Sequence, residues 1–223
     1  MDMDIRLSLS RLSRNIWFTS DTHYAHKNIC RGVSEWTNKN GTRDFPDLSK
    51  MNDILVKNIN DVVAPDDILF HLGDWSFGGI ENVRNFRDRI VCQNVHLILG
   101  NHDHHIKRNT DSLQDLFLSV SKIANLEIKI DHSPKMVADS RFKFVLSHYP
   151  IASWEDMNRG VIHLHGHVHL TPQHRLHEGK SMDVGCDGNG LKPINARDII
   201  SIMNRQPIAK TTLLKDHHEE GDN

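Results

Sequence analysis

The chain has 223 residues, of which 38% are hydrophobic, so it can form one sizeable core but is too short for two ample domains. Its formal net charge of -2 argues against a broad basic surface for nucleic acid or anionic membranes. The three cysteines form an odd set without a close pairing motif, which favours reduced thiols in a cytoplasmic setting.

The N-terminal residues do not resemble a secretion signal. Met1-Asp2-Met3-Asp4 is acidic where a signal peptide needs a basic region, and no uninterrupted apolar block follows. No segment approaches the roughly 20 apolar residues that cross a bilayer. We therefore expect a cytoplasmic protein without a membrane partner. We further expect residues 1–214 to form a single domain and residues 215–223 a disordered polar tail.

The first half of the chain alternates between expected strands and helices. Apolar runs predict strands near residues 5–9, 15–20, 68–72 and 94–99. Between Asp47 and Val63 the apolar residues recur at spacings of three and four, which predicts an amphipathic helix capped by Asp47 and stopped by Pro65. Further helices are expected near residues 80–90 and 111–118. Strand, helix and strand in this order favour a parallel sheet.

The second half has the pattern of a second sheet. Short β-like runs at residues 126–130, 135–138 and 142–146 are separated by turn residues, which predicts meandering strands. Two more strands are expected near 161–165 and 181–185, and a last helix over residues 195–204. The polar, turn-rich residues 34–46 predict a surface loop.

Five of the apolar runs lead into residues that can bind a metal or transfer a proton. These are Asp21-Thr22-His23, Gly73-Asp74, Gly100-Asn101-His102-Asp103, Ser147-His148 and Gly166-His167-Val168-His169. Their donors are oxygen and nitrogen without a thiolate, a set that suits Mn, Fe, Co, Ni or Zn ions. Because a carboxylate such as Asp74 can bridge two cations, these groups could hold two metals about 3.5–4 Å apart.

In this order, the five blocks resemble the calcineurin-like metallophosphoesterase superfamily over roughly residues 16–190. The resemblance implies an α/β fold, a four-layer α/β/β/α sandwich of two mixed β-sheets flanked by helices. It also implies two divalent metal ions, for which we expect Mn²⁺ first, with Fe, Ni, Co or Zn as alternatives. One metal would be held by Asp21, His23, Asp74 and His169, and the other by Asp74, Asn101, His148 and His167. His102 resembles the catalytic histidine of the family, which stabilises the transition state or protonates the leaving group.

One branch of the family is disfavoured. Protein Ser/Thr phosphatases extend the second block with a further Asp and an Arg, whereas residues 73–79 here read Gly-Asp-Trp-Ser-Phe-Gly-Gly. The usual phosphate-clamping arginine is thus missing, and the chain looks like a compact bacterial or phage member. This interpretation as a bacterial or phage member is based on the segments Ser20–Asn28 and Asp183–Gly188.

Substrate contacts are less well defined by the sequence. The candidates are His26, Asn28, Arg43 and Arg159. For His26 and Asn28 a solvated helix start is an equal alternative, and the two arginines are candidate phosphate clamps. Trp36, Trp75 and Trp154 could stack a base, although core packing is the commoner use of tryptophan. Asp103 is interpreted as structural, capping a turn or orienting a neighbour.

These observations predict a dinuclear metal-dependent phosphoesterase that hydrolyses small phosphomonoesters or phosphodiesters, with nucleotides as one option. A metal-bridging hydroxide would attack phosphorus, and His102 would assist the leaving group. The alternatives are a nuclease, which the absence of a basic groove argues against, and an inactive scaffold, which the complete ligand set argues against. The expected partner is a small phosphate ester rather than nucleic acid, and the oligomeric state is left open.

Overall fold

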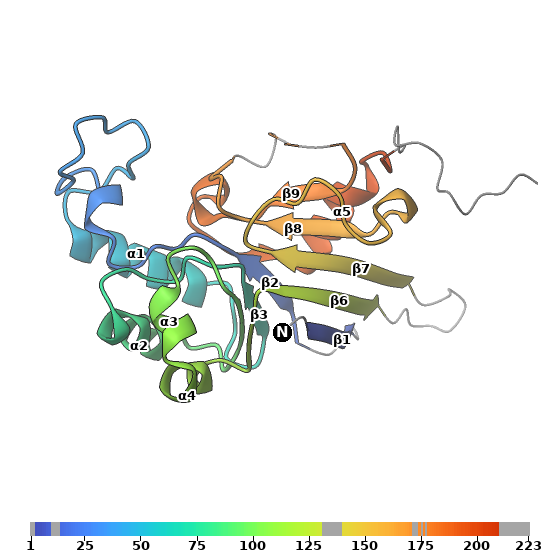
Figure 1. Cartoon of the computed structure of the whole chain (residues 1–223), viewed down its shortest axis with the longest axis horizontal. Coiled ribbons are helices and arrows are strands. Elements are labelled where there is room, and N and C mark those ends of the chain that lie inside the picture. The colour runs from blue at the N-terminus through green and yellow to red at the C-terminus, as the bar shows by residue number, and fades with distance from the viewer. Residues whose placement is uncertain are drawn as a thin grey trace, which may run out of the picture.

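The computed structural model describes residues 3–9, 14–130, 140–170, 174, 176 and 178–209. Two five-stranded sheets face each other (Figure 1). The first sheet consists, in spatial order, of β10 (Ile194–Asn195), β2 (Ile16–Thr19), β3 (Ile68–His71), β4 (Asn94–Ile98) and β5 (Ser119–Ser121). The second sheet consists of β1 (Met3–Leu9), β6 (Ile123–Ile130), β7 (Ser140–Ser147), β8 (Ile162–His165) and β9 (Ser181–Asp183).

Both sheets are mixed. In the first, β2 to β5 are parallel and β10 pairs antiparallel with β2. In the second, β6 and β7 pair antiparallel, as the meandering pattern predicted, whereas β1, β8 and β9 each join in parallel. The α/β class with two mixed sheets and flanking helices is therefore confirmed. The predicted strand at residues 135–138 and the predicted tail at 215–223 lie outside the described residues.

The helices cover the sheets unevenly. Their bounds are α1 (Leu48–Asn60), α2 (Ile80–Arg89), α3 (His104–Arg108), α4 (Thr110–Leu113) and α5 (Ala196–Asn204), with short 3-10 helices η1 (Lys27–Ile29), η2 (Gln114–Leu116), η3 (Met157–Arg159) and η4 (Cys186–Asn189). Residues of α1 and α2 pack with Leu69 and Leu97 on the outer face of the first sheet. Helix α5 packs instead against the core between the sheets.

That central core explains why the two sheets stay together. Phe18 of β2 stacks on Phe70 of β3 at 5.4 Å between ring centroids, and it contacts Phe144 of β7 at 5.8 Å. All three rings are buried. Because Leu69 and Phe70 pack on opposite faces, the first sheet is buried on both sides, which is why its strands read as continuous apolar runs.

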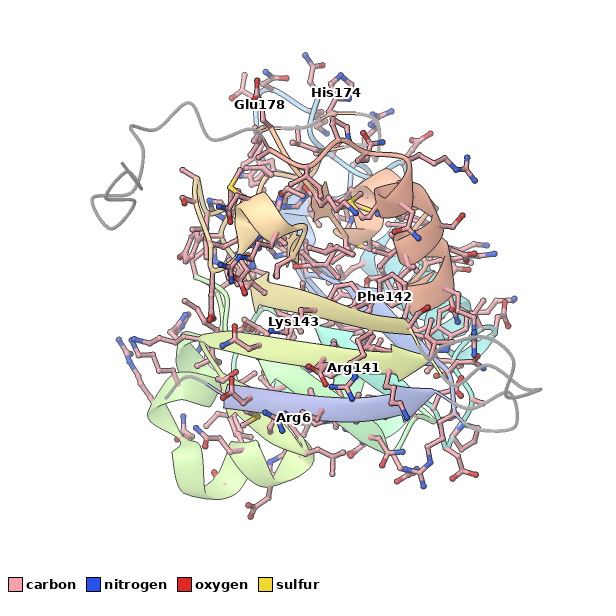
Figure 2. The ribbon with its side chains drawn as sticks, turned by 90° about the vertical axis from the view of Figure 1, so that its right-hand side faces the viewer. Arg6, Arg141, Phe142, Lys143, His174 and Glu178 are labelled. Atoms are coloured by element: carbon pink, nitrogen blue, oxygen red, sulfur yellow. The ribbon has the colours of Figure 1, made fainter. Side chains whose placement is uncertain are left out.

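The outer face of the second sheet is polar. Arg6, Glu127 and Lys143 lie side by side on β1, β6 and β7, and Figure 2 looks onto these strands. Among the described residues, the loop that contains η3 packs on this face at Val145, through Trp154 and Val161, while Arg6 and Lys143 are exposed. None of the helices in the described ranges is long and apolar enough to span a bilayer.

Candidate metal centre

The predicted metal ligands follow five strands whose ends meet between the two sheets. Asp21, Asp74 and Asn101 come after β2, β3 and β4 of the first sheet. His148, His167 and His169 come after β7 and β8 of the second sheet. Because each of these two groups of strands is parallel, their carboxyl ends meet at a common edge.

The backbone turns sharply at these ligands. Five of the seven predicted ligands have positive φ angles, between 46° and 72°: Asp21, His23, Asp74, His167 and His169. Left-handed backbone is uncommon for residues other than glycine and is strained, so such a group at one place marks a functional site. The turn directs each side chain off the strand end and toward the space between the sheets.

Two glycines allow the loops to approach this closely. A Cβ at Gly100 would lie 2.2 Å from Asp74 Oδ1, and a Cβ at Gly166 would lie 2.3 Å from Asp21 Oδ2. Neither distance is compatible with a side chain. The glycines of the third and fifth sequence blocks therefore make room for the two carboxylates.

Asp74 lies at the centre of the site. Its Oδ2 is 3.6 Å from His23 Nε2 and 3.5 Å from His148 Nε2, so one carboxylate oxygen faces a histidine on either side. Its Oδ1 accepts a hydrogen bond from the backbone N–H of His102 at 2.8 Å. Burial raises the pKa of Asp74 above its ordinary value. A buried carboxylate of this kind is stabilised by nearby positive charge.

Asp103 holds the loop of Asp74 in place. Its carboxylate accepts hydrogen bonds from the backbone N–H groups of Asp74, Trp75 and Gly100. It is buried, and burial raises its pKa. Asp103 thus has the structural role that the sequence suggested, joining the second block to the third.

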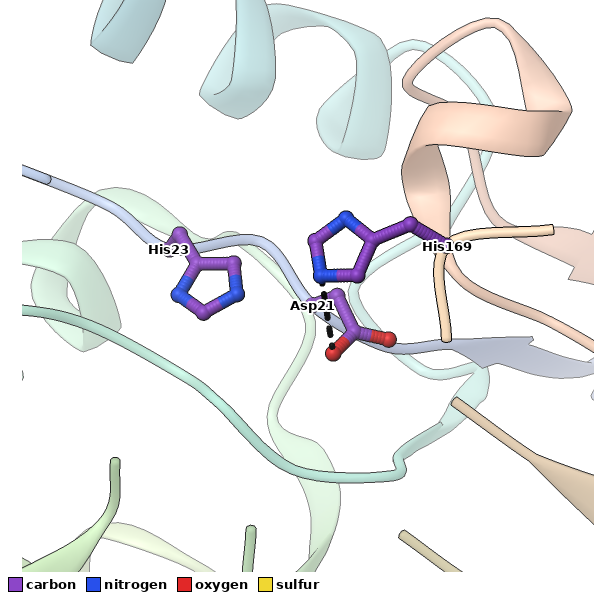
Figure 3. A group of neighbouring side chains, drawn as sticks. All are labelled: Asp21, His23 and His169. Carbon is purple, nitrogen blue, oxygen red and sulfur yellow. Dashed lines mark ion pairs between the residues drawn. The ribbon is translucent and has the colours of Figure 1, made fainter. Parts of the chain in front are cut away.

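Asp21 carries the second buried carboxylate. Its Oδ2 accepts a hydrogen bond from the backbone N–H of His167, but its Oδ1 has no hydrogen-bond partner among the described residues. Oδ1 lies 3.7 Å from His169 Nε2, the pair joined by the dashed line in Figure 3. Burial raises the pKa of Asp21 to about 7. An unpartnered carboxylate oxygen beside two histidines, His23 and His169, fits the coordination of a divalent cation.

His148 presents a free lone pair to the other side of Asp74. Its Nδ1 lies 2.8 Å from the carbonyl oxygen of Leu72, so Nδ1 carries the proton and donates it. Burial lowers the pKa of His148 to about 4, so the ring is neutral near pH 7 and Nε2 is unprotonated. Nε2 is 2.9 Å from Asn101 Oδ1, and the ring of His167 is 5.1 Å away. Two acceptor atoms this close fit a shared cation.

An ion pair between the buried Arg43 and the half-buried Asp187 supports His169. Asp187 Oδ2 accepts a hydrogen bond from His169 Nδ1 at 2.6 Å. Arg43 in turn donates from Nε to Asp187 Oδ1 at 2.7 Å and from Nη2 to Oδ2 at 3.0 Å. Although burial alone would raise it, these bonds hold the pKa of Asp187 well below its usual range. A carboxylate that fixes the ring of a metal-binding histidine is a common support of metal sites.

The structure thereby gives Arg43 a place different from the proposed phosphate clamp. Its side chain is buried, and the guanidinium also donates to the carbonyl oxygens of Asp21 and Thr22. It braces the first block and Asp187 instead of facing solvent. Asp187 itself was not among the predicted site residues, although it lies within the segment Asp183–Gly188 that served as a family cue.

Of the remaining predicted substrate residues, two lie away from the predicted ligands and one lies beside them. Asn28 Oδ1 accepts from the backbone N–H of Glu35 and so supports the loop. Arg159 is exposed and pairs with Asp156 on the η3 segment. Among the described residues, neither side chain forms a hydrogen bond or ion pair with any of the seven predicted ligands. His26, by contrast, lies close to His23 at 5.4 Å and to His102 at 6.4 Å between ring centroids.

His26 and His102 line a pocket together with two of the predicted metal ligands. The pocket has a volume of about 450 Å³. Its lining consists of His23, His26, Ile29, Trp36, Gly41, Phe77, His102 and His169. Pockets that bind small molecules have volumes of roughly 300–1,000 Å³. Burial lowers the pKa of His26 to about 4 and that of His23 well below its ordinary value, so both rings are neutral near pH 7.

A family model described as calcineurin-like phosphoesterase matches residues 14–192, the span that contains all of these ligands. The chain belongs to the calcineurin-like phosphoesterase family. Membership supports phosphoester hydrolysis in general, and the Asp and His groups described above are its candidate metal ligands.

Similar proteins occur in archaea and phages. The chain is 25% identical over 203 residues to an uncharacterized protein of Methanocaldococcus jannaschii, covering 89% of this chain and 96% of that protein. It is 27% identical over 190 residues to the gene 66 protein of Mycobacterium phage D29, covering 74% and 87%. The gene 66 protein of Mycobacterium phage L5 is 26% identical over 208 residues, covering 85% and 94%.

A solved structure shares the fold. The crystal structure of a protein of unknown function from Aquifex aeolicus superposes with a TM-score of 0.54 at 21% sequence identity, covering 85% of this chain and all of that one. This similarity supports the two-sheet architecture of the family.

Proposed function

We propose that this protein is a dinuclear metal-dependent phosphoesterase that hydrolyses small phosphomonoesters or phosphodiesters. The observation that carries the proposal is Asp74 Oδ2, which faces His23 Nε2 at 3.6 Å and His148 Nε2 at 3.5 Å. One carboxylate placed between two histidines supports a shared ligand for two cations. Mn²⁺ is the first candidate, because oxygen and imidazole donors without thiolate suit it.

The residues would divide between two positions. With Asp74 shared, Asp21, His23 and His169 would hold one cation, and Asn101, His148 and His167 the other; Asp21 also lies close to Asp74 and His148. When bound, two divalent cations would lower the pKa of a shared water and offset charge on the phosphoryl oxygens. The buried carboxylates would hold the cations, while Asp187 and the carbonyl oxygen of Leu72 bond to Nδ1 of His169 and His148 and leave Nε2 of each ring for the site.

His102 has a different part in the proposal. Its backbone N–H orients Asp74, while its side chain lines the pocket and is partly exposed. From that position the imidazole can donate a proton to the oxygen of a departing alcohol. This role, like the division of ligands, follows from the family resemblance and is supported by the location of the ring.

The proposal is tested by metal content and hydrolysis together. The stripped protein, reloaded with Mn²⁺, should hydrolyse p-nitrophenyl phosphate or bis-p-nitrophenyl phosphate in preference to single-stranded DNA. Asp74→Asn should weaken the binding of both cations, since its carboxylate is shared. Asn101→Ala should weaken the binding of only one. Isothermal titration calorimetry with Mn²⁺ measures both, with Asp53→Asn on the outside of α1 as control.

Two results would contradict the proposal. If Asp74→Asn and Asn101→Ala lose the same number of cations, Asp74 is not shared. If the Mn²⁺-loaded protein cleaves no phosphate ester, the fold serves as a binding scaffold. Preferential cleavage of DNA would favour the nuclease instead, although the net charge of -2 provides little attraction for a polyanion.

A further inference from the structure

The pocket beside the metal centre has an aromatic wall. The rings of His26 and Phe77 are stacked, 3.9 Å apart between centroids and 6° from parallel. The ring of Trp36 meets His26 edge-on, at 5.8 Å and 84°, and so forms a corner with that wall. Because His26 and Phe77 cover each other's facing surfaces, their outer faces and edges, together with the indole of Trp36, remain to contact a flat ligand group.

Trp36 is held where a ligand can reach it. It is 43% exposed, whereas Trp75 and Trp154 are 0% and 8% exposed. It belongs to the loop between η1 and α1, which projects from the body of the molecule (Figure 1). The loop is tied back by the parallel bridge between Cys30 and Arg43, and by the hydrogen bond from Gly32 N to Phe45 O. An exposed tryptophan on a braced loop is a candidate ligand contact, unlike the two buried ones.

The wall lies on the side where a leaving group would depart. His102, the candidate proton donor, contacts Phe77 at 4.8 Å between ring centroids, and both line the pocket. A substrate whose phosphate is held by the metal ligands would therefore extend its alcohol portion along His102 toward Phe77, His26 and Trp36. The aromatic residues of this wall therefore determine which alcohol portion the pocket can bind.

The charge of the pocket lining limits which leaving groups it can bind. Among the described residues that line the pocket there is neither a lysine nor an arginine. The nearby Arg43 is buried with its guanidinium bonded to Asp187 and backbone carbonyls. A second phosphate group would find no cationic partner there. A neutral planar group, by contrast, would stack on the rings with a gain that does not depend on the identity of the base.

We infer that the pocket formed by Trp36, His26 and Phe77 binds the nucleobase of a nucleoside monophosphate whose phosphate lies at the metal centre. The inference rests on the proposed phosphoesterase function and specifies its leaving group. It distinguishes nucleotides from sugar phosphates, which have the same phosphate without a planar ring, and from nucleoside diphosphates, which bring an additional charge.

Binding is tested first, without reference to turnover. In the Mn²⁺-loaded protein, adenosine 5′-monophosphate should quench tryptophan emission on mixing, before turnover, whereas ribose 5-phosphate and inorganic phosphate should not. Trp36→Phe should remove this quenching, because the responding indole is gone. Leu118→Ala is the control, at an apolar position that is 59% exposed next to β5. Adenosine 5′-monophosphate should quench the emission of this variant as it does that of the parent.

Kinetics then measure selectivity. Trp36→Ala should lower the preference for adenosine 5′-monophosphate over ribose 5-phosphate, expressed as the ratio of kcat/KM, by on the order of tenfold. Trp36→Phe, which keeps a ring, should retain most of the preference. Metal content by calorimetry should be the same in both variants.

The results separate this inference from the proposed function. Hydrolysis of both esters with no preference, or a preference that Trp36→Ala changes less than twofold, overturns the nucleobase pocket and leaves the phosphoesterase intact. Absence of hydrolysis of any ester overturns the proposed function, and the quenching titration then decides base binding by itself. Equal quenching by ribose 5-phosphate also overturns the inference.

Discussion

His102 combines two contacts that belong to different parts of the residue. Its backbone N–H holds Asp74 Oδ1, and its imidazole lines the pocket. We predict that His102→Ala keeps both cations, because the backbone bond remains, but lowers kcat by roughly 10²- to 10⁴-fold through loss of the proton donor. Calorimetry and steady-state kinetics on the same preparation check this. Loss of metal from His102→Ala would assign the side chain to the ligands instead.

Asp187 acts on the site through another residue. We predict that Asp187→Asn weakens cation binding by about 10- to 100-fold, because His169 loses the charged acceptor that orients its ring. Titration calorimetry measures the loss. The control is Asp44→Asn, an exposed carboxylate beside Arg43 in sequence. Unchanged affinity in Asp187→Asn would show that the ring of His169 is oriented without it.

The grouping of the candidate ligands could be predicted from sequence because these polar donors follow apolar strands, in an order shared with a known family. Asp187 and Arg43 could not be paired in this way, since 144 residues separate them and nothing in either local pattern indicates the other. Phe77 was missed for a similar reason. It lies in a glycine-containing loop without a repeating apolar pattern, and only the folded chain places it on His26.

Among the helices, α1 shows how a local signal sets an element boundary. The helix begins at Leu48, and Asp47 Oδ1 accepts a hydrogen bond from Lys50 N at 2.7 Å, as the capping pattern predicted. We predict that Asp47→Ala lowers the free energy of unfolding by about 1 kcal/mol and Tm by about 2–4 °C. Thermal denaturation measures the change, with Asp66→Ala, an exposed carboxylate outside the helix, as control. An unchanged Tm would show that water replaces the cap.

Other elements were less predictable. The single helix expected over residues 111–118 is instead divided into α4 and η2, and α3 precedes it at His104–Arg108. Three short elements in succession lack the repeated apolar spacing that identifies a longer helix. Strands β5 and β10 have three and two residues, too few for an alternating pattern, and depend on pairing with β4 and β2.

At the scale of the whole molecule, one buried histidine should affect the response to acid. His71 Nε2 donates to Thr22 Oγ1, whose hydroxyl donates to Trp75 O, and His71 Nδ1 has no hydrogen-bond partner among the described residues. Burial, aided by His148, lowers the pKa of His71 from 6.5 to about 3. Below pH 6.5 the unfolded chain therefore binds a proton that the folded chain does not bind, and this group reduces stability as the pH falls toward 3.

We predict that His71→Gln, which keeps a donor for Thr22, makes the loss of stability on acidification shallower. The difference between parent and variant should be about 1.4 kcal/mol per pH unit between pH 6 and pH 4. Urea unfolding of the metal-free proteins at several pH values measures it. Parallel stability curves for the two proteins would show that His71 does not control this response.

The position of the ligands also has a mechanical consequence. Four of the seven predicted ligands follow strands of the first sheet and three follow strands of the second, and the approaches of Asp74 to His148 and of Asp21 to His169 cross from one sheet to the other. Cations bound there would act as a reversible cross-link, similar in effect to a disulfide between the two halves. The same ions that support chemistry would then resist separation of the sheets, so metal supply and the lifetime of the folded chain would rise and fall together.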